Sequence, residues 1–195
     1  ESVERAHESH VAALARVRAG IPDGWASADV ERDSLSRFLF APEDVIVVVG
    51  PDGLVANVAK YVDTQVVVGI NSVPESQAGV LVRCAPEEGI CALRRLDEGA
   101  DLRVDHLTMV QASVDDSRSL RALNEVFIGH PSHQSARYEL RAGSVVERQS
   151  SSGLVVSTGT GATGWGASLK RGRHMGELPA PTSRSLAWFV REAWP

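Results

Sequence analysis

Two short apolar runs, at residues 45–49 and 66–70, dominate the hydrophobic pattern of the first half of the chain. Neither run has a polar face, which is typical of parallel strands that are covered on both sides. Between them, residues 50–53 form a break, and apolar residues then recur at helical spacing over 54–62. The pattern therefore predicts a strand–helix–strand unit with a parallel sheet.

The other apolar positions of this half predict helices and short strands. Val3, Val11, Leu14 and Val17 keep a helical spacing, and Gly20 and Pro22 end that helix. Weaker patterns predict short strands at 27–32 and 80–83, a helical turn at 34–38 and a helix over 87–96.

After Gly99 the pattern changes to short alternating segments, which predict antiparallel strands. We expect strands at 103–114, 119–128, 136–140, 144–148 and 153–157, turns at 115–116 and 142–143, and a helix at 165–170. The predicted fold is an α/β nucleotide-binding domain over 1–99, followed by an all-β, sandwich-like domain over 100–195. Two domains of different layer type favour a ligand site in the crevice between them.

Composition narrows the class of protein. The 195 residues are 43% hydrophobic and 23% charged, as in an ordinary globular protein. A net charge of −5 argues against a nucleic-acid binder, and no apolar run approaches the roughly 20 residues that span a bilayer. Cys84 and Cys91 fit two thiols in a reducing cytoplasm better than a disulfide framework or a zinc site. We expect a cytoplasmic protein with neither nucleic-acid nor membrane partners.

The turn Gly50-Pro51-Asp52-Gly53 is the first candidate site, because it follows a buried strand. Open α/β sheets bind ligands at the carboxyl ends of their strands, and glycines allow phosphate to approach the backbone. Asp52 has a carboxylate that can accept a proton or hold a metal ion. The same four residues also fit an ordinary type I or II turn.

Asn124 and Glu125 are the second candidate, since an amide and a carboxylate are unusual side by side in an apolar strand. Both can form hydrogen bonds with ribose hydroxyls, although an exposed strand end would also accommodate them. The third candidate is the turn from Ser157 to Trp165, which is rich in hydroxyls and glycines. It suits a polar ligand with an aromatic stacking face, or a helix N-cap.

In this order the three motifs resemble the NAD kinase family, over roughly residues 43–195. Its Gly-Gly-Asp-Gly-Thr signature corresponds to residues 50–54, its Asn-Glu to 124–125, and its Thr/Gly turn to 158–161. Residues 69–71 resemble its Gly-(Ile/Val)-Asn, while 151–154, 158–161 and 189–192 resemble the mitochondrial-type branch and its bacterial relatives.

The resemblance implies ATP-dependent phosphorylation of the 2′-hydroxyl of the adenosine ribose of NAD. ATP, NAD and Mg²⁺ are the implied cofactors, with nucleotides as small-molecule partners and a homo-oligomer, dimer or tetramer, as the implied assembly. No residue is assigned to a metal. Asp52 is the implied catalytic base. The implied nucleotide-binding residues are Gly50, Gly53, Asn71, Asn124, Glu125, Thr158, Thr160, Gly161, Thr163, Gly164 and Trp165.

Two departures leave other functions open. Pro51 replaces a glycine and removes a backbone N–H, and Leu54 replaces a threonine and removes a hydroxyl. The alternatives are an NAD(P)-binding protein without kinase activity, or a kinase for another hydroxyl acceptor such as a lipid or a sugar. Compared with the family, the chain is expected to lack a first βα unit and some C-terminal strands.

Overall fold

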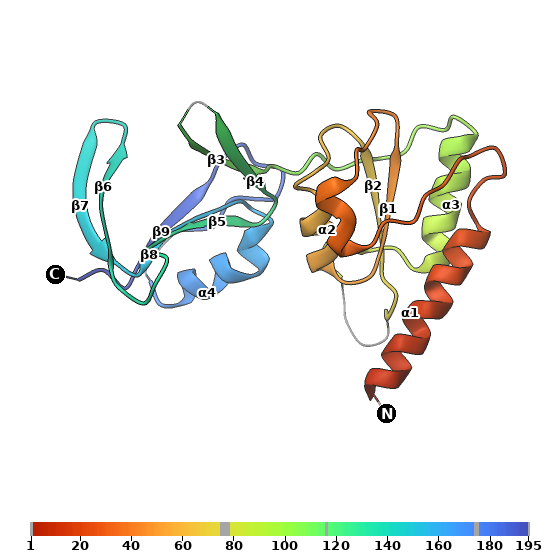
Figure 1. Ribbon diagram of the computed structural model, residues 1–195, viewed down its shortest axis with the longest axis horizontal. Helices are drawn as coiled ribbons and strands as arrows, with labels where there is room; N and C mark the ends of the chain where they lie inside the picture. Colours follow the sequence, from red (N-terminus) through yellow and green to blue (C-terminus); the bar gives the residue numbers. More distant parts are fainter. Residues whose placement is uncertain (1, 75–78, 116, 174–175, 195) are drawn as a thin grey trace. The chain divides into compact units, whose positions relative to one another are not determined.

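The computed structural model describes residues 2–74, 79–115, 117–173 and 176–194. They divide into two compact units, residues 1–104 (unit 1) and residues 105–195 (unit 2). Unit 1 combines helices with parallel strands, and unit 2 consists mainly of antiparallel strands (Figure 1). In the described part of the chain, no helix is both long and apolar enough to cross a membrane.

Unit 1 is built on two parallel strands, β1 (Val45–Val49) and β2 (Val66–Ile70). They pair in register from one end to the other, and α2 (Asp52–Val58) lies between them in the chain. This arrangement confirms the predicted strand–helix–strand unit. The remaining elements of unit 1 are α1 (Ser2–Ala19), the 3-10 helix η1 (Arg32–Arg37) and α3 (Pro86–Asp97).

Both faces of the strand pair are covered, as the absence of a polar face predicts. On one face, Ala13 and Val17 of α1 and Leu93 of α3 form a buried cluster with the strands. The alternate residues Ile46 and Val48 are buried as well, on the face where α2 lies (Figure 1). The two strands are therefore fixed in position, and so are the loops at their carboxyl ends.

Three predictions for unit 1 need correction. The helix expected at 54–62 begins at Asp52 and ends at Val58. Residues 27–31 form no strand; they are mostly exposed and lack the half-buried surface that stabilises one. Residues 80–83 form no strand either, because the N–H groups of 80–82 are bonded to a side chain and not to a neighbouring strand. Cys84, just beyond them, makes an isolated parallel bridge to Ile70.

Unit 2 is built around β8 (Gly153–Ser157), which pairs antiparallel with β5 (Glu125–Ile128) on one side and β9 (Ala187–Arg191) on the other. Val155 and Phe189 at its centre are 0% and 1% exposed. The other elements of unit 2 are the hairpins β3 (Val110–Val114) with β4 (Arg118–Ala122) and β6 (Ala136–Ala142) with β7 (Val145–Ser151), the 3-10 helix η2 (Gly161–Thr163) and α4 (Trp165–Arg171).

The strands of unit 2 differ from the prediction in extent. The strand expected at 103–114 begins only at Val110, and the one expected at 119–128 is divided in two. The division falls at Leu123 and Asn124, whose carbonyl groups bond to Thr158. At the expected hairpin turns, Asp115 and Gly143 have φ of 58° and 59°, while Asp116 lies outside the described residues.

Candidate functional site

The first candidate motif lies at the carboxyl ends of β1 and β2 in unit 1. Gly50 has φ of 150° and donates its N–H to the carbonyl of Ile70, 3.0 Å away. Gly53, in the first turn of α2, is exposed, and a Cβ added there would meet no atom within 4 Å. The backbone around Gly53 is therefore open to an approaching group.

Asp52 is held by the loop that follows β2. Its Oδ2 accepts the N–H of Val80 at 2.9 Å, and its Oδ1 accepts those of Leu81 and Val82 at 2.8 and 2.9 Å. Burial raises the pKa of Asp52, but the three hydrogen bonds and the charge of Arg83 outweigh it, so the net pKa lies below the usual value. Asp52 is thus an anion that fastens the 80–82 loop to α2.

Asn71 stabilises the same loop. Its Oδ1 accepts the N–H of Val73 at 2.9 Å, and its own N–H donates to the carbonyl of Cys84 at 2.8 Å. The side chain is 9% exposed. Asp52, the predicted catalytic base, and Asn71, predicted to bind the nucleotide, thus both contribute to the internal structure of one loop.

In unit 2, the buried hydroxyl of Thr158 organises the turn after β8. Its Oγ1 donates to the carbonyls of Leu123 and Asn124, at 2.6 and 3.1 Å, and accepts the N–H groups of Thr160 and Gly161, at 3.1 and 3.2 Å. The side chain is 0% exposed. Thr158 therefore joins the main chain before β5 to the main chain of the turn, and its hydroxyl is fully used by the protein.

Two buried oxygens beside Thr158 have no partner. The Oδ1 of Asn124 and the Oγ1 of Thr160 are both inaccessible to solvent and form no hydrogen bond with the described residues. Thr160 as a whole is 3% exposed. Leaving such an atom unpaired costs roughly 1–3 kcal/mol, and natural proteins rarely do so without a ligand, water or ion. These two oxygens are therefore unsatisfied polar atoms of the turn after β8.

The backbone at this place is tightly packed around Gly161. A Cβ at Gly161 would overlap the carbonyl oxygen of Asn124 and come within 2.5 Å of the hydroxyl of Ser157. Any side chain at this position would push apart the ends of β5 and β8. Glycine is required here by close packing, whereas the sequence alone suggested contact with a ligand.

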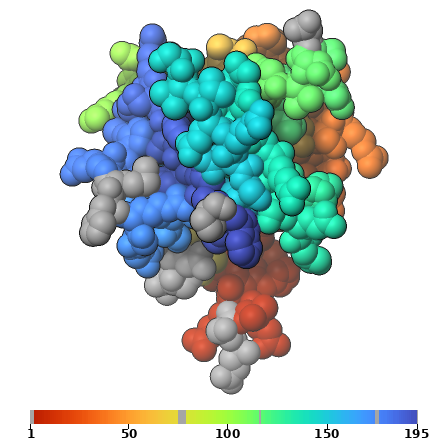
Figure 2. All heavy atoms as spheres, turned by 90° about the vertical axis from the view of Figure 1, so that its left-hand side faces the viewer, coloured from red at the N-terminus to blue at the C-terminus, as the bar shows by residue number. Residues whose placement is uncertain are grey.

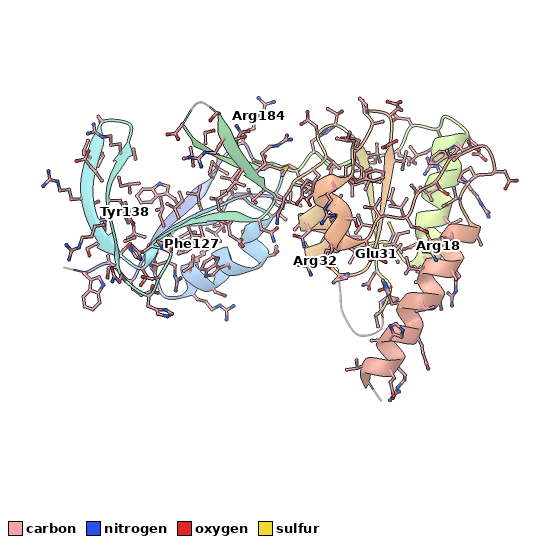
Figure 3. The ribbon with its side chains drawn as sticks, viewed as in Figure 1. Arg18, Glu31, Arg32, Phe127, Tyr138 and Arg184 are labelled. Carbon is pink, nitrogen blue, oxygen red and sulfur yellow. The ribbon has the colours of Figure 1, made fainter. Side chains whose placement is uncertain are left out.

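Trp165 begins α4 and lies beside an aromatic ring and a cation. Its ring centroid is 5.8 Å from that of Phe127 on β5, which Figure 3 labels, and the Arg191 guanidinium lies 5.3 Å from the Trp165 ring. The Nε of Arg191 is also buried without a partner. The sequence-based prediction assigned no role to Phe127 or Arg191, although Arg191 lies within the 189–192 segment that resembles the NAD kinase family.

The remaining predicted residues differ in their surroundings. Glu125 pairs with Ser157 across β5 and β8, and burial raises the pKa of its carboxyl. Thr163 donates its hydroxyl to the carbonyl of Thr160 at 2.9 Å and is exposed, as is Gly164. The structure therefore gathers Asn124, Glu125, Thr158, Thr160 and Gly161 in unit 2, with Thr163 and Gly164 on its surface.

Among the residues that the structure describes, no group of three or more acidic, histidine or cysteine side chains is placed to hold a metal ion.

No family model matches the chain, and its sequence matches no characterised protein closely. A likeness does exist to the crystal structure of an NAD kinase from Archaeoglobus fulgidus in complex with ATP. The TM-score is 0.57 at 22% sequence identity, over 78% of this chain and 57% of that chain. This chain has the fold of that NAD kinase over the shared part, and spans less than two thirds of its length. The likeness to the mitochondrial-type branch stays a prediction.

Proposed function

We propose that this chain carries the nucleotide-binding part of an ATP-dependent NAD kinase. The observation that carries the proposal is the pair of buried, unpaired oxygens of Asn124 and Thr160 beside the hydroxyl-rich turn. Ribose hydroxyls are donors that match two such acceptors. The shared fold with an NAD kinase, itself crystallised with ATP, supports an adenine nucleotide as the ligand.

In this proposal, each site residue of unit 2 binds and orients the dinucleotide. The Asn124 amide, the Thr160 hydroxyl and the Glu125 carboxylate form hydrogen bonds to ribose hydroxyls, while Thr158 keeps the turn in shape. Trp165, already flanked by an aromatic ring, lines the pocket wall. Thr163 and Gly164 contact the dinucleotide at the surface of the turn.

The reaction transfers the γ-phosphoryl group of ATP to the ribose 2′-hydroxyl of NAD. The bond to the ADP oxygen breaks, a bond to the 2′-oxygen forms, and the hydroxyl proton leaves to a base. Mg²⁺ on the ATP neutralises phosphate charge. Asp52 is the sequence-based candidate for the base, and Gly50, Gly53 and Asn71 for the phosphate loop. Three N–H groups already bind Asp52 and lower its pKa, so Asp52 becomes a stronger base if the 80–82 loop releases it.

The decisive experiment is a coupled assay of the full-length protein for NADP formed from NAD, ATP and Mg²⁺. Calorimetric titration with NAD gives the binding step separately. Asn124→Ala removes a buried acceptor and should weaken binding by about 1–3 kcal/mol, which is roughly 5- to 150-fold in Kd. Ser144→Ala, which alters an exposed hydroxyl in the turn between β6 and β7, is the control. If NAD produces no heat and no thermal shift, the proposal is wrong.

A second candidate function is NAD(P) binding without phosphoryl transfer. The observation that favours it is in unit 1: Pro51 lacks the N–H of a glycine, Leu54 lacks a hydroxyl, and the Asp52 carboxylate is occupied. NAD would then bind with no NADP formed. The double variant Pro51→Gly/Leu54→Thr returns the N–H and the hydroxyl, so turnover in that variant alone would trace the loss to this loop.

We also propose a cytoplasmic homo-oligomer, a dimer or tetramer. The β6–β7 hairpin, cyan in Figure 2, supports association because Val145 and Val146 on it are 63% and 51% exposed. A two-stranded hairpin is marginally stable by itself and gains from a covering surface. Light scattering on a size-exclusion column measures the oligomer directly, and a monomer at assay concentration would contradict this part of the proposal.

A further inference from the structure

A hollow of about 430 Å³ lies in unit 2 beside α4. Three cationic side chains contribute to its wall, two from the last turn of α4 and one just beyond it. Apolar groups form the rest. Its lining residues are Ala162, Ala167, Lys170, Arg171, Arg173 and Leu178.

The three cations have no acidic partner within the described part of unit 2. Neither Lys170 nor Arg171 forms an ion pair or a side-chain hydrogen bond there. Arg173 donates from Nη2 to the carbonyl of Val190 at 2.5 Å, and its guanidinium lies 5.9 Å from the Phe189 ring. A neutral carbonyl leaves the charge of Arg173 uncompensated. Three positive charges therefore share one concave surface without a counter-ion.

The dipole of α4 explains only part of this arrangement. Cations in the last turn of a helix are favourable, which accounts for Lys170 and Arg171. It does not account for Arg173, which lies outside the helix and is anchored to β9. Nor does it explain why the three side chains line one hollow, whose described lining residues include no carboxylate.

We infer that this hollow, which we call the basic hollow, binds an oligophosphate anion. Lys and Arg side chains are the usual protein ligands of phosphate, and three of them match the charge of several linked phosphates better than that of one. The volume lies within the range of small-molecule sites, so it exceeds the space that a single phosphate needs. The anion is either a free oligophosphate or the phosphate chain of a nucleotide.

This inference does not depend on NAD binding. The basic hollow contains none of the residues proposed to hold the dinucleotide, although Ala162 belongs to η2 in the same turn. The basic hollow can therefore bind tripolyphosphate in a protein that fails to bind NAD, and the reverse also holds.

The test is calorimetric titration of the intact protein with inorganic tripolyphosphate at about 50 mM salt, low enough to preserve charge interactions. We expect saturable binding of one anion per chain. The double variant Lys170→Gln/Arg171→Gln should weaken it by about tenfold or more, because two charge-assisted contacts are lost. Arg173 is left unchanged because it also holds β9.

The matched control is Arg137→Gln/Arg184→Gln. It removes the same charge from exposed positions of unit 2 outside the basic hollow, and Arg184 is labelled in Figure 3. Tripolyphosphate affinity should change less than about twofold in this control, because neither side chain lines the basic hollow. Absence of saturable binding to the unaltered protein, or an equal loss in both double variants, would overturn the inference.

Two further binding experiments identify the ligand. Orthophosphate should bind more weakly than tripolyphosphate, and equal affinity would contradict an oligophosphate site. Displacement of bound tripolyphosphate by ATP in the unaltered protein would identify a nucleotide as the source of the phosphates. Simultaneous binding of both would identify a free oligophosphate.

Discussion

Replacing Asp52 by asparagine separates two roles for this residue, the base of a kinase and the fastening of the 80–82 loop. Asparagine has the same size but carries no charge. Through one oxygen it can still accept the N–H groups of Leu81 and Val82, while its NH₂ group faces the N–H of Val80. The structure therefore predicts a loss of stability and not only a loss of basicity.

The magnitude follows from the three hydrogen bonds. A bond to a charged acceptor contributes about 1.5–3 kcal/mol, and a neutral one about 0.5–1.5. Two bonds thus weaken by about 1 kcal/mol each. The third is lost, but Val80 is 36% exposed and water replaces its partner. We expect Asp52→Asn to lower the free energy of unfolding of unit 1 by about 2 kcal/mol.

Urea unfolding followed by circular dichroism measures this loss, and amide hydrogen exchange locates it at residues 80–82. Asp44→Asn is the matched control, since Asp44 accepts one backbone N–H, that of Ala41, at 2.8 Å. Asp44→Asn should lower the free energy of unfolding by at most about 1 kcal/mol, the difference between a hydrogen bond to a charged acceptor and one to a neutral acceptor. If Asp52→Asn unfolds like the unaltered protein while turnover falls by the 10²–10⁴-fold typical of a lost base, the fastening role is wrong.

Acid gives an independent measure of the same contacts. The pKa of Asp52 is lower in the folded protein than in the unfolded chain, so its ionised form stabilises folding at neutral pH. That stabilisation is complete above the unfolded pKa, near 3.8, and disappears as pH falls through the lower folded value. Asp52→Asn should remove this part of the acid sensitivity.

Three further predictions concern unit 2. Thr158→Val leaves the N–H groups of Thr160 and Gly161 and the carbonyl of Leu123 without their buried partner. It should lower the free energy of unfolding, measured in urea, by about 2–4 kcal/mol. Thr163→Val should lower the free energy of unfolding by less than about 1 kcal/mol. Burial raises the pKa of Glu125 in the folded protein. Unit 2 should therefore lose stability as pH rises from the unfolded pKa, near 4.5, through the higher folded pKa. Thermal melts across pH 4–7 measure this dependence, and Glu125→Gln should abolish it. With 5-fluorotryptophan labelling, the fluorine NMR signal of Trp165 is assigned by its loss in Trp165→Phe, and it should shift when NAD is added. An unchanged signal at saturation would mean that Trp165 only packs against Phe127 and Arg191.

Hydrophobic pattern predicted the elements that are held by burial. β1 and β2 follow from runs of β-branched residues, and α1 from helical spacing, because each must bury an apolar face. The failures lie where side chains and not strands bind the backbone. Residues 80–82 are apolar in sequence, yet their N–H groups bond to Asp52, 28 to 30 positions earlier. No local pattern encodes such a partner.

The candidate site was predictable in its residue types but not in their states. The sequence marked Thr158 and Thr160 equally, as hydroxyls of one turn. In the structure, the hydroxyl of Thr158 forms four hydrogen bonds, and the hydroxyl of Thr160 is buried without a partner. That difference depends on where the carbonyls of Leu123 and Asn124 lie, which only the folded pairing of β5 and β8 decides.

The two units therefore differ in readiness for a ligand. In unit 2, Asn124 and Thr160 have unpaired oxygens, and binding would satisfy them. In unit 1, the Asp52 carboxylate becomes fully available only if the 80–82 loop opens. The bonds from Leu81 and Val82 contribute about 1.5–3 kcal/mol each, about 3–6 kcal/mol together, while water replaces the partner of the more exposed Val80. Such a cost leaves roughly one molecule in 150 to one in 25,000 open at equilibrium. Turnover that requires the open loop would fall by this factor unless ATP binds the open loop more tightly than the closed one, since a ligand shifts an equilibrium only by its difference in affinity.

Hydrogen exchange of residues 80–82 with and without ATP distinguishes these cases. Faster exchange with ATP supports a kinase, and unchanged exchange supports a protein that only binds the dinucleotide.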